Sequence, residues 1–341
     1  MAVSTCSWRR AIVCSRSLCI STKNTKSTKG TKNKKGTKDV MLTRREFGAL
    51  ALSSVAWPAL GRAQTVSGVR LGVQTYSFRE LMRPAGGDLV DPVIAAMKEC
   101  GLTECELWAP QIEPASTGGG GRPTPEEAQR SREGLRKWRL ETPLDHFRSI
   151  GKRFNTAGIT IYAFNYSPNG SFSDEEIDRG FEMAKALGAE IITASATLEA
   201  ARRMVPFAAK HRMPVAMHNH SNVSDPNEFA TLESLATALK LSPQFRINLD
   251  IGHFTAANND AVAYIREHHH QITNLHLKDR KKNQGDNVAW GTGDTPIREV
   301  LQLLKKERWP IRAYIEYEHK GEVGAVEEVK KCLAFARSAL A

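Results

Sequence analysis

The sequence lacks several features that would assign it to common classes of protein. Among its 341 residues there is no Cys-x-x-Cys pair and no His-Glu-x-x-His motif, which excludes metal sites with those fixed spacings. Three of the six cysteines precede residue 40, so an odd number remains in the rest of the chain. We therefore expect inert thiols at Cys100, Cys105 and Cys332 rather than a disulfide framework.

A net positive charge is also missing from most of the chain, although the formal charge of the whole is +11. Residues 1–40 contain three Arg, seven Lys and one Asp, and residues 41–63 contain three Arg and one Glu. Residues 64–341 consequently carry no formal net charge. Because nucleic-acid binding needs a clustered positive face, we do not expect the folded part to bind nucleic acid.

The first 40 residues have the composition of an unfolded leader. Residues 23–38 (KNTKSTKGTKNKKGTK) contain no apolar side chain and cannot form a core. We predict a disordered basic leader over 1–40. An over-extended gene start upstream of Met41 would explain it, and a translated basic tail is the alternative.

A secretory signal follows this leader. Arg44-Arg45 precede an apolar run over 49–60 and a small-residue cleavage site at 61–63, an order that resembles a twin-arginine signal. The run is too short to span a bilayer. We predict a signal peptide at 41–63 and a periplasmic or secreted protein without stable membrane association after cleavage. An amphipathic membrane anchor is the alternative.

Short apolar runs alternate with amphipathic stretches from residue 69 to the C-terminus. The predicted strands are 69–76, 103–108, 159–165, 190–195, 215–220, 246–251, 273–278 and 313–317. The predicted helices are 88–100, 144–157, 174–187, 198–211, 226–240, 258–269, 295–307 and 324–340. Eight strand-helix units in about 270 residues predict a parallel sheet closed into a single-domain (β/α)₈ barrel over 64–341.

Residues typical of helix ends support several of these boundaries. Ser173 precedes three acidic residues, and Pro226 would stand in a first helical turn. Gly101, Gly158 and Gly188 stand where a helix ends and the chain turns toward a strand.

The longest interruption of the pattern is the excursion 111–142. It contains four consecutive glycines and a charged stretch, 124–139, with a helical pattern. Loops of this length are usually functional or mobile. We expect either a lid-like excursion over the barrel mouth or a decorated surface loop.

Imidazole and charged side chains gather at the ends of the last four predicted strands. Residues two apart in a strand point to the same side, and the C-terminal ends of barrel strands form the active-site rim. Mixed nitrogen and oxygen donors at one rim suit a single Zn²⁺, Mn²⁺, Co²⁺ or Fe²⁺ ion. In chain order these side chains are His218 and His220, Asp250 and His253, His276 and Lys278, and Glu316 and Glu318.

The same motifs resemble the xylose isomerase-like barrel superfamily. The resemblance covers about residues 69–340. It is carried by Asp-Ile-Gly-His at 250–253, His-Leu-Lys-Asp at 276–279 and Ile-Glu-Tyr-Glu at 315–318, and further by Glu106-Leu107-Trp108. The superfamily includes sugar phosphate isomerases and epimerases, inosose dehydratases and endonuclease IV.

The resemblance implies a metal ion bound by Asp250, His276, Glu316 and a residue of the fifth strand. Relatives that epimerise ketoses commonly have glutamate at that fifth-strand position, whereas this chain has His218. The pair of metal-bound glutamates that exchange a proton in those epimerases is therefore incomplete here. A His-x-His strand is more similar to the dehydratase relatives.

The expected activity is isomerisation or epimerisation of a keto- or aldo-sugar, through a metal-bound enediolate formed by proton abstraction. Glu316 or His220 is the candidate base, and His253 and Lys278 are further catalytic candidates. The candidate residues for binding the sugar are Tyr76, Trp108, Asn165, His253 and Arg280.

Two other functions stay open at this point. Loss of a β-substituent from the same intermediate would make the enzyme a lyase or dehydratase acting on a keto-sugar or a 3-keto-glycoside. A periplasmic carbohydrate-binding barrel with a structural metal is the alternative that is not an enzyme. DNA repair is not expected, because the first three predicted strands end near Tyr76, Trp108 and Asn165 instead of further metal ligands. All three candidate functions imply a small-molecule carbohydrate as the partner. A homo-oligomer is possible with each of them.

Overall fold

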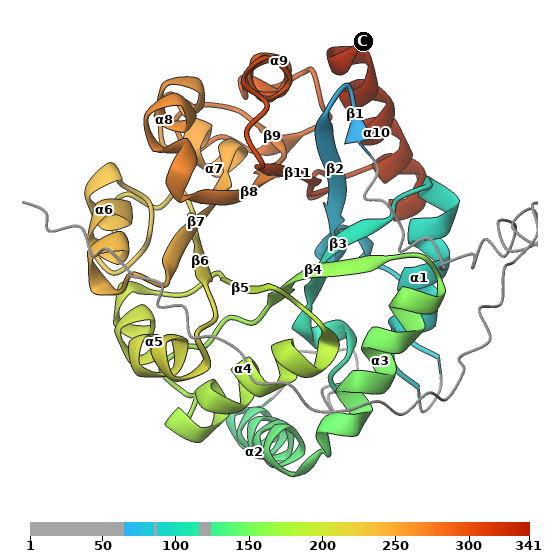
Figure 1. Ribbon diagram of the computed structural model, residues 1–341, viewed down its shortest axis with the longest axis vertical. Coiled ribbons are helices and arrows are strands. Elements are labelled where there is room, and N and C mark those ends of the chain that lie inside the picture. Colours follow the sequence, from blue (N-terminus) through green and yellow to red (C-terminus); the bar gives the residue numbers. More distant parts are fainter. Residues whose placement is uncertain (1–64, 85–86, 116–123) are drawn as a thin grey trace, which may run out of the picture. The chain divides into compact units, whose positions relative to one another are not determined.

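Eight parallel strands form a closed barrel in the computed structural model, which describes residues 65–84, 87–115 and 124–341 (Figure 1). The barrel strands are β2 (Val69–Gln74), β3 (Glu104–Trp108), β4 (Thr160–Asn165), β5 (Ile191–Ala194), β6 (Val215–His218), β7 (Phe245–Asp250), β8 (Ile272–Leu277) and β11 (Arg312–Ile315). They pair in chain order, and β2 pairs with both β3 and β11, which closes the sheet. The predicted (β/α)₈ barrel is confirmed, and each predicted strand overlaps an observed one.

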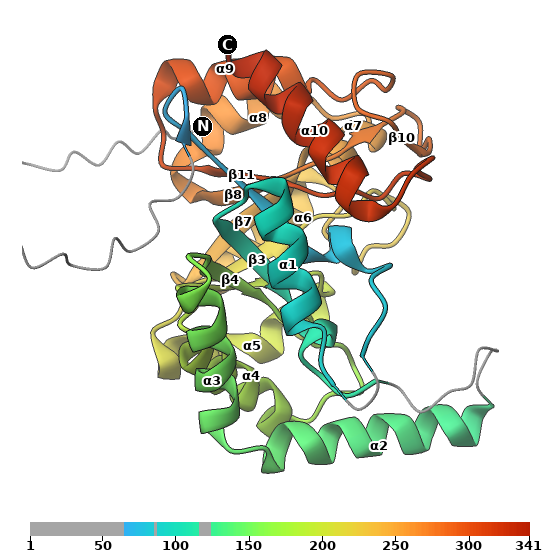
Figure 2. The same ribbon diagram turned by 90° about the vertical axis from the view of Figure 1, so that its right-hand side faces the viewer.

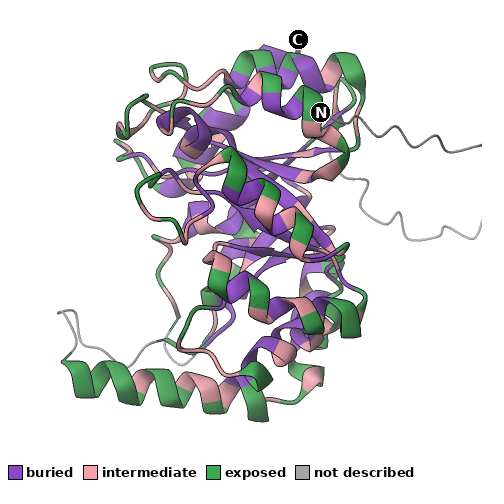
Figure 3. Cartoon of the chain, turned by 90° about the vertical axis from the view of Figure 1, so that its left-hand side faces the viewer, coloured by how far each residue is buried: buried purple, intermediate pink, exposed green. Residues whose placement is uncertain are grey.

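Helices cover the outside of this barrel (Figure 1). They are α1 (Val90–Cys100), α2 (Pro125–Glu141), α3 (Leu144–Thr156), α4 (Asp174–Leu187), α5 (Leu198–His211), α6 (Leu232–Leu241), α7 (Ile251–Ala256), α8 (Ala261–His268), α9 (Ile297–Glu307) and α10 (Ala325–Leu340). The short strand β1 (Thr65–Val66) pairs antiparallel with β2, and β9 (Asp279–Arg280) pairs with β10 (Asn287–Val288). Buried residues line the strands and the inner faces of the helices (Figure 3).

The predicted start of α4 at Ser173 and the predicted end of α1 at Gly101 are confirmed, whereas the helix start predicted at Pro226 is wrong. The Ser173 side chain accepts from the backbone N–H three residues later at the start of α4, and Gly101 ends α1 in the left-handed region with φ of 68°. Pro226 does not begin a helix. Helix α6 begins after Thr231, whose side chain accepts from the backbone N–H of Ser234 and so satisfies an orphan donor of the first turn.

The predicted leader (1–40), the predicted signal peptide (41–63) and the glycine run (118–121) lie outside the described residues. Within 65–84, 87–115 and 124–341, no helix combines the length and apolarity needed to cross a bilayer.

The described end of the 111–142 excursion forms helix α2, which packs on the outer side of α4 (Figures 1 and 2). Arg139 fixes α2 to the barrel, because its guanidinium donates to Glu113 at 2.8 Å and to Glu176 at 3.2 Å, and all three side chains are buried. The N-terminal half of α2 is almost entirely exposed (Figure 3). A lid-like excursion and a decorated surface loop both stay predictions.

Polar side chains fill the inside of the barrel in successive layers. Near the N-terminal ends of the strands, Glu104 accepts from Arg312 at 3.0 Å and from the Tyr314 hydroxyl at 2.8 Å. Two residues further along β3, the fully buried Glu106 occupies the middle of the barrel. The histidines and acids of the predicted metal site form the next layer, at the C-terminal ends of the strands.

Candidate metal centre

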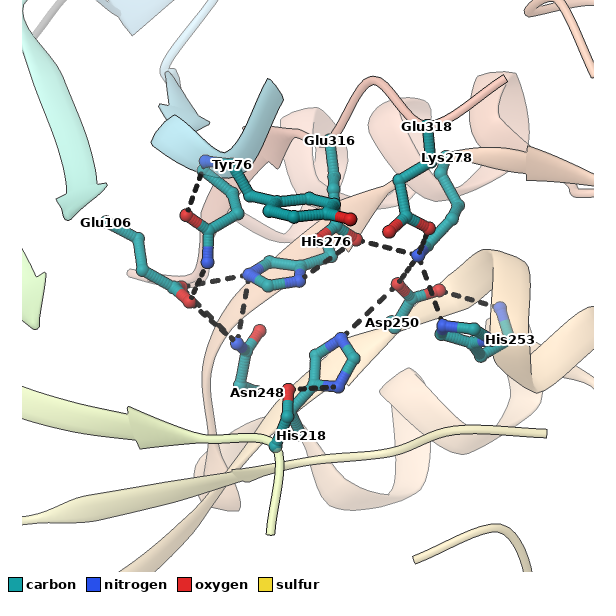
Figure 4. A network of polar contacts seen from close by, with 12 residues as sticks. Tyr76, Glu106, His218, Asn248, Asp250, His253, His276, Lys278, Glu316 and Glu318 are labelled. Carbon is teal, nitrogen blue, oxygen red and sulfur yellow. Dashed lines mark hydrogen bonds and ion pairs between the residues drawn. The ribbon is translucent and has the colours of Figure 1, made fainter. Parts of the chain in front are cut away.

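The structure brings the four predicted metal ligands together at the C-terminal ends of neighbouring strands (Figure 4). His218 ends β6, Asp250 ends β7, His276 lies near the end of β8, and Glu316 directly follows β11. Asp250 and His276 are register partners of β7 and β8, so the sheet itself sets these two side by side. One donor atom from each of the four residues lies within 4.8 Å of the others.

Each of these donor atoms is buried and faces the other donors, and the Lys278 ammonium also contacts the two carboxylate oxygens. The four atoms are His218 Nε2, Asp250 Oδ2, His276 Nδ1 and Glu316 Oε2. His218 Nε2 is 3.4 Å from Asp250 Oδ2, and His276 Nδ1 is 3.3 Å from Glu316 Oε2. Because buried polar atoms need partners and these four face one another, they indicate a site for a ligand that pairs with all four. Two nitrogens and two oxygens fit one divalent metal ion.

The other polar atoms of these ligands are held by protein groups. Asp250 Oδ1 accepts from the backbone N–H of His253 at 2.6 Å, and His218 Nδ1 lies 3.2 Å from Ser195 Oγ. His276 Nε2 lies 2.9 Å from Glu106 Oε2. Contacts of this kind orient metal ligands, because they leave one lone pair pointing into the site.

Asn219, which follows His218, ties the ends of β6 and β7 together. Its side-chain amide donates to the Asp250 carbonyl at 3.1 Å and accepts from the Asp250 N–H at 2.9 Å. The His-x-His pattern predicts roles for the two histidines alone, so this role of the residue between them was not predicted from the sequence.

Lys278 lies against the same donors. Its Nζ is 3.0 Å from Asp250 Oδ2 and 2.9 Å from Glu316 Oε2, and it also contacts Glu318. Burial lowers the pKa of the ammonium, but the three carboxylates raise it more, so the net shift is upward. Burial likewise raises the pKa of Asp250 and of Glu316, but Lys278 and the neighbouring histidines hold both below their ordinary values. Gly252 permits this approach, because a Cβ built there would lie 2.4 Å from Lys278 Cγ.

Two further histidines border the donor set. The His220 ring is 5.2 Å from the rings of both His218 and His253. Burial, His218 and Lys278 lower the pKa of His220 to about 4, and burial with Lys278 lowers that of His253 strongly. The His220 side chain is 38% exposed, and its Nδ1 lies 3.8 Å from Glu228 Oε2. His220 is therefore placed between the donors and the solvent.

The predicted sugar-binding residues lie in three different places of the structure. Tyr76 and Trp108 form an edge-to-face pair with ring centroids 4.8 Å apart, and the Tyr76 ring lies beside His276 (Figure 4). Asn165 lies deeper in the barrel and donates to Glu106. The Arg280 guanidinium donates to the Ser221 hydroxyl and the Gly285 carbonyl and contacts His253 Nδ1 at 2.6 Å. A sugar-binding role for these residues stays a prediction.

Glu106 is the main residue of this region to which sequence reasoning gave no role. Its carboxylate contacts His276 and accepts from side chains of several strands in the layer below the donor set (Figure 4). A signal was present, because a charged residue in the middle of the apolar run Cys105 to Trp108 needs a buried partner.

The chain is a parallel (β/α)₈ barrel with nitrogen- and oxygen-bearing side chains at the C-terminal ends of its strands, where the active sites of such barrels lie. The family described as Xylose isomerase-like TIM barrel matches residues 94–339, and the chain belongs to this family.

Solved structures share the fold at low sequence identity. A sugar phosphate isomerase/epimerase from Parabacteroides distasonis is 17% identical with a TM-score of 0.53, covering 79% of this chain and 95% of its own. A probable 3-DHS dehydratase from Bacillus anthracis is 16% identical with a TM-score of 0.55, covering 77% and 98%. The 3-keto-D-glucoside 4-epimerase YcjR from E. coli is 14% identical with a TM-score of 0.53, covering 79% and 99%. No protein with a curated description matches the sequence.

Proposed function

We propose that this chain is a metal-dependent enzyme of the isomerase and epimerase kind that acts on a keto- or aldo-sugar. One observation carries the proposal: four buried nitrogen and oxygen donor atoms face one another at the end of the barrel where active sites lie. Similarity to the barrels of a sugar phosphate isomerase/epimerase and a 3-keto-D-glucoside 4-epimerase supports a carbohydrate substrate.

The donor set would hold one divalent ion through His218, Asp250, His276 and Glu316. Two imidazoles and two carboxylates suit Mn²⁺, Zn²⁺, Co²⁺ or Fe²⁺. An ion bound there would supply Lewis acidity toward a substrate carbonyl and thereby acidify the neighbouring C–H bond.

A side chain in or beside the donor set would remove that proton. His220 is the first candidate, because its ring lies next to His218, is not one of the four donors and is reachable from solvent. Glu316 is the second candidate. In isomerisation or epimerisation the C–H bond breaks, the base takes the proton, and the proton returns to the neighbouring carbon or to the opposite face of the same carbon. Lys278 Nζ and His253 Nε2 lie 3.1 Å apart, and both side chains would orient substrate hydroxyls.

A lyase or dehydratase is the second candidate function. Strand β6 ends in His218, so the proton exchange between two glutamates that the ketose epimerases use has only Glu316 here. After proton removal, a β-substituent would leave with its bonding electrons and take a proton from Lys278 or His253. The similarity of the barrel to a probable 3-DHS dehydratase supports keeping this reaction.

Incubation of the metal-loaded protein with free ketoses and with 3-keto-glycosides in D₂O separates these candidates. Deuterium in a recovered epimer or isomer supports the isomerase, whereas a released aglycone or an unsaturated product supports the lyase. The Asp250→Asn variant, which loses a metal donor, is the matched control. Sugar binding without any product across the panel would contradict the enzymatic proposal and leave a carbohydrate-binding barrel.

We also propose that the protein reaches the periplasm, or is secreted, through twin-arginine export. Arg44-Arg45 and the short apolar run after them support this route, which carries folded proteins. Mass spectrometry of the N-terminus of the native protein tests it. A mature start near residue 64 is expected, and a retained peptide from 1–40 would contradict the proposal.

A further inference from the structure

One buried carboxylate lies beneath the donor set, in the centre of the barrel. Glu106 is fully buried, and six side chains from β2, β4, β5, β7 and β8 contact its two oxygens. The contacting atoms are Gln74 Nε2 at 2.7 Å, Asn165 Nδ2 at 3.1 Å, Thr193 Oγ1 at 2.7 Å, Asn248 Nδ2 at 3.3 Å, Asn274 Nδ2 at 2.9 Å and His276 Nε2 at 2.9 Å. Five of these donors are neutral, so His276 is the group that links the carboxylate to the site above it (Figure 4).

The contact with His276 fixes which ring nitrogen faces the metal site. An ionised carboxylate only accepts hydrogen bonds, so His276 Nε2 carries the proton that points at Glu106. His276 Nδ1 is then the nitrogen that faces the donor set, where it lies 3.3 Å from Glu316 Oε2.

A comparison with the other buried acid of β3 shows what Glu106 lacks. Glu104 is compensated by the Arg312 guanidinium at 3.0 Å. The hydrogen-bond donors of Glu106 include no lysine or arginine. Its one titratable partner is His276, whose ring faces the donor set on its other side, so a divalent ion there would add positive charge close to this carboxylate.

We propose that Glu106 is a positioning residue for the metal centre. It holds the ring orientation and tautomer of His276, and its negative charge strengthens the attraction for a divalent ion. This inference rests on the metal centre proposed above and adds a residue that supports it from inside the barrel.

The Glu106→Gln variant tests the proposal through the affinity for Mn²⁺ and Zn²⁺, measured by competition with a chelator. The expected result is a dissociation constant raised roughly 10- to 100-fold. Glu104→Gln is the matched control, since it removes an equally buried acid of the same strand that contacts no metal donor, and its affinity should stay within about threefold of wild type. Glu106→Asp keeps the charge and should recover part of the lost affinity. Nitrogen-15 shifts of His276 in the metal-free protein should show a proton on Nε2 in the wild type and a reduced occupancy of that proton in Glu106→Gln.

A double-mutant cycle separates positioning from general damage to the barrel. In a His276→Asn background, Glu106→Gln should change metal affinity less than about threefold, because the ring through which Glu106 acts is absent. Equal affinity in wild type and Glu106→Gln, or an equal loss in Glu106→Gln and Glu104→Gln, would overturn the role of Glu106 alone. Failure of the wild type to bind any divalent ion would overturn the metal centre and this inference together.

Discussion

The Lys278 ammonium and the Glu316 carboxylate lie 2.9 Å apart, and the contact is made by the same oxygen that faces the other metal donors. The ammonium is also 3.0 Å from the corresponding oxygen of Asp250. A cation of the protein therefore shares two carboxylate oxygens with the metal that we propose. Because like charges repel strongly at this range inside a protein, a bound divalent ion and the ammonium compete for these oxygens.

Replacement of Lys278 by methionine should have opposite effects on the metal-free and the metal-bound protein. Without the ammonium, the buried carboxylates of Asp250 and Glu316 lose their lysine partner, which should cost the metal-free protein about 3 kcal/mol or more of unfolding free energy. The divalent ion should bind more tightly, because its competitor is gone. Thermal unfolding with and without metal measures both effects.

A matched control for that variant is Lys330→Met on helix α10. Lys330 pairs with Glu99 and Glu327 at the surface, where ion pairs contribute little. It should leave both melting temperatures nearly unchanged. Weaker metal binding in Lys278→Met would show that the ammonium supports the ion instead of competing with it.

The buried ion pairs of Arg139 should hold helix α2 in place without affecting the metal site. Arg139→Met leaves the buried Glu113 without its guanidinium, a change of the kind that costs about 3–5 kcal/mol, while Glu176 keeps its contact with Arg136. Backbone amides of 125–141 should exchange with solvent faster in this variant, while metal content stays unchanged. Arg132→Met, at an exposed position of the same helix, is the control, and equal exchange in the two variants would contradict the anchoring role.

Metal removal should lower the stability of the protein by an amount set by binding. A ligand at 1,000 times its dissociation constant stabilises the folded state by about 4 kcal/mol. For a domain of this size we expect the melting temperature to rise by roughly 10 °C when metal is restored after treatment with a chelator. Asp250→Asn should show no such rise, and a similar rise in that variant would place the ion elsewhere.

Replacement of His220 by asparagine should reduce turnover and leave metal binding intact. Loss of a general base typically lowers kcat by a factor of about 10² to 10⁴. His220 lies beside the donors without being one of them, so metal content should equal that of wild type. His270→Asn, at an exposed position before β8, is the control. Activity within a few-fold of wild type would transfer the role of base to Glu316.

The fold could be predicted from the sequence because apolar strand segments and segments with the helical 3.6-residue period alternate clearly along the chain. Buried barrel strands are short apolar runs, and the helices between them have amphipathic patterns, so each barrel strand was located. Helix α7 (Ile251–Ala256) was missed, because its six residues directly follow β7 and show no helical period of their own. The start of α6 was misplaced by Pro226, because a proline suits a turn as well as a first helical position.

The grouping of the four donors could be predicted because a barrel places the C-terminal ends of all its strands at one rim. The layer beneath them was missed, although Asn248 and Asn274 stand two residues before Asp250 and His276 and therefore face the same side. The contact of these amides with Glu106 joins residues up to 168 positions apart, and only the closed barrel shows it. The crowding of Lys278 against two of the donors likewise depends on side-chain reach, which a strand pattern does not encode.

Elemental analysis of the purified protein tests the metal centre most directly, with Asp250→Asn and Glu316→Gln as donor variants and Glu318→Gln as the neighbouring acid outside the donor set. The account predicts about one Mn, Zn, Co or Fe ion per chain in the wild type and in Glu318→Gln, and a small fraction of that in the two donor variants. Wild-type protein that retains no divalent ion, or the same metal content in all four proteins, would contradict it.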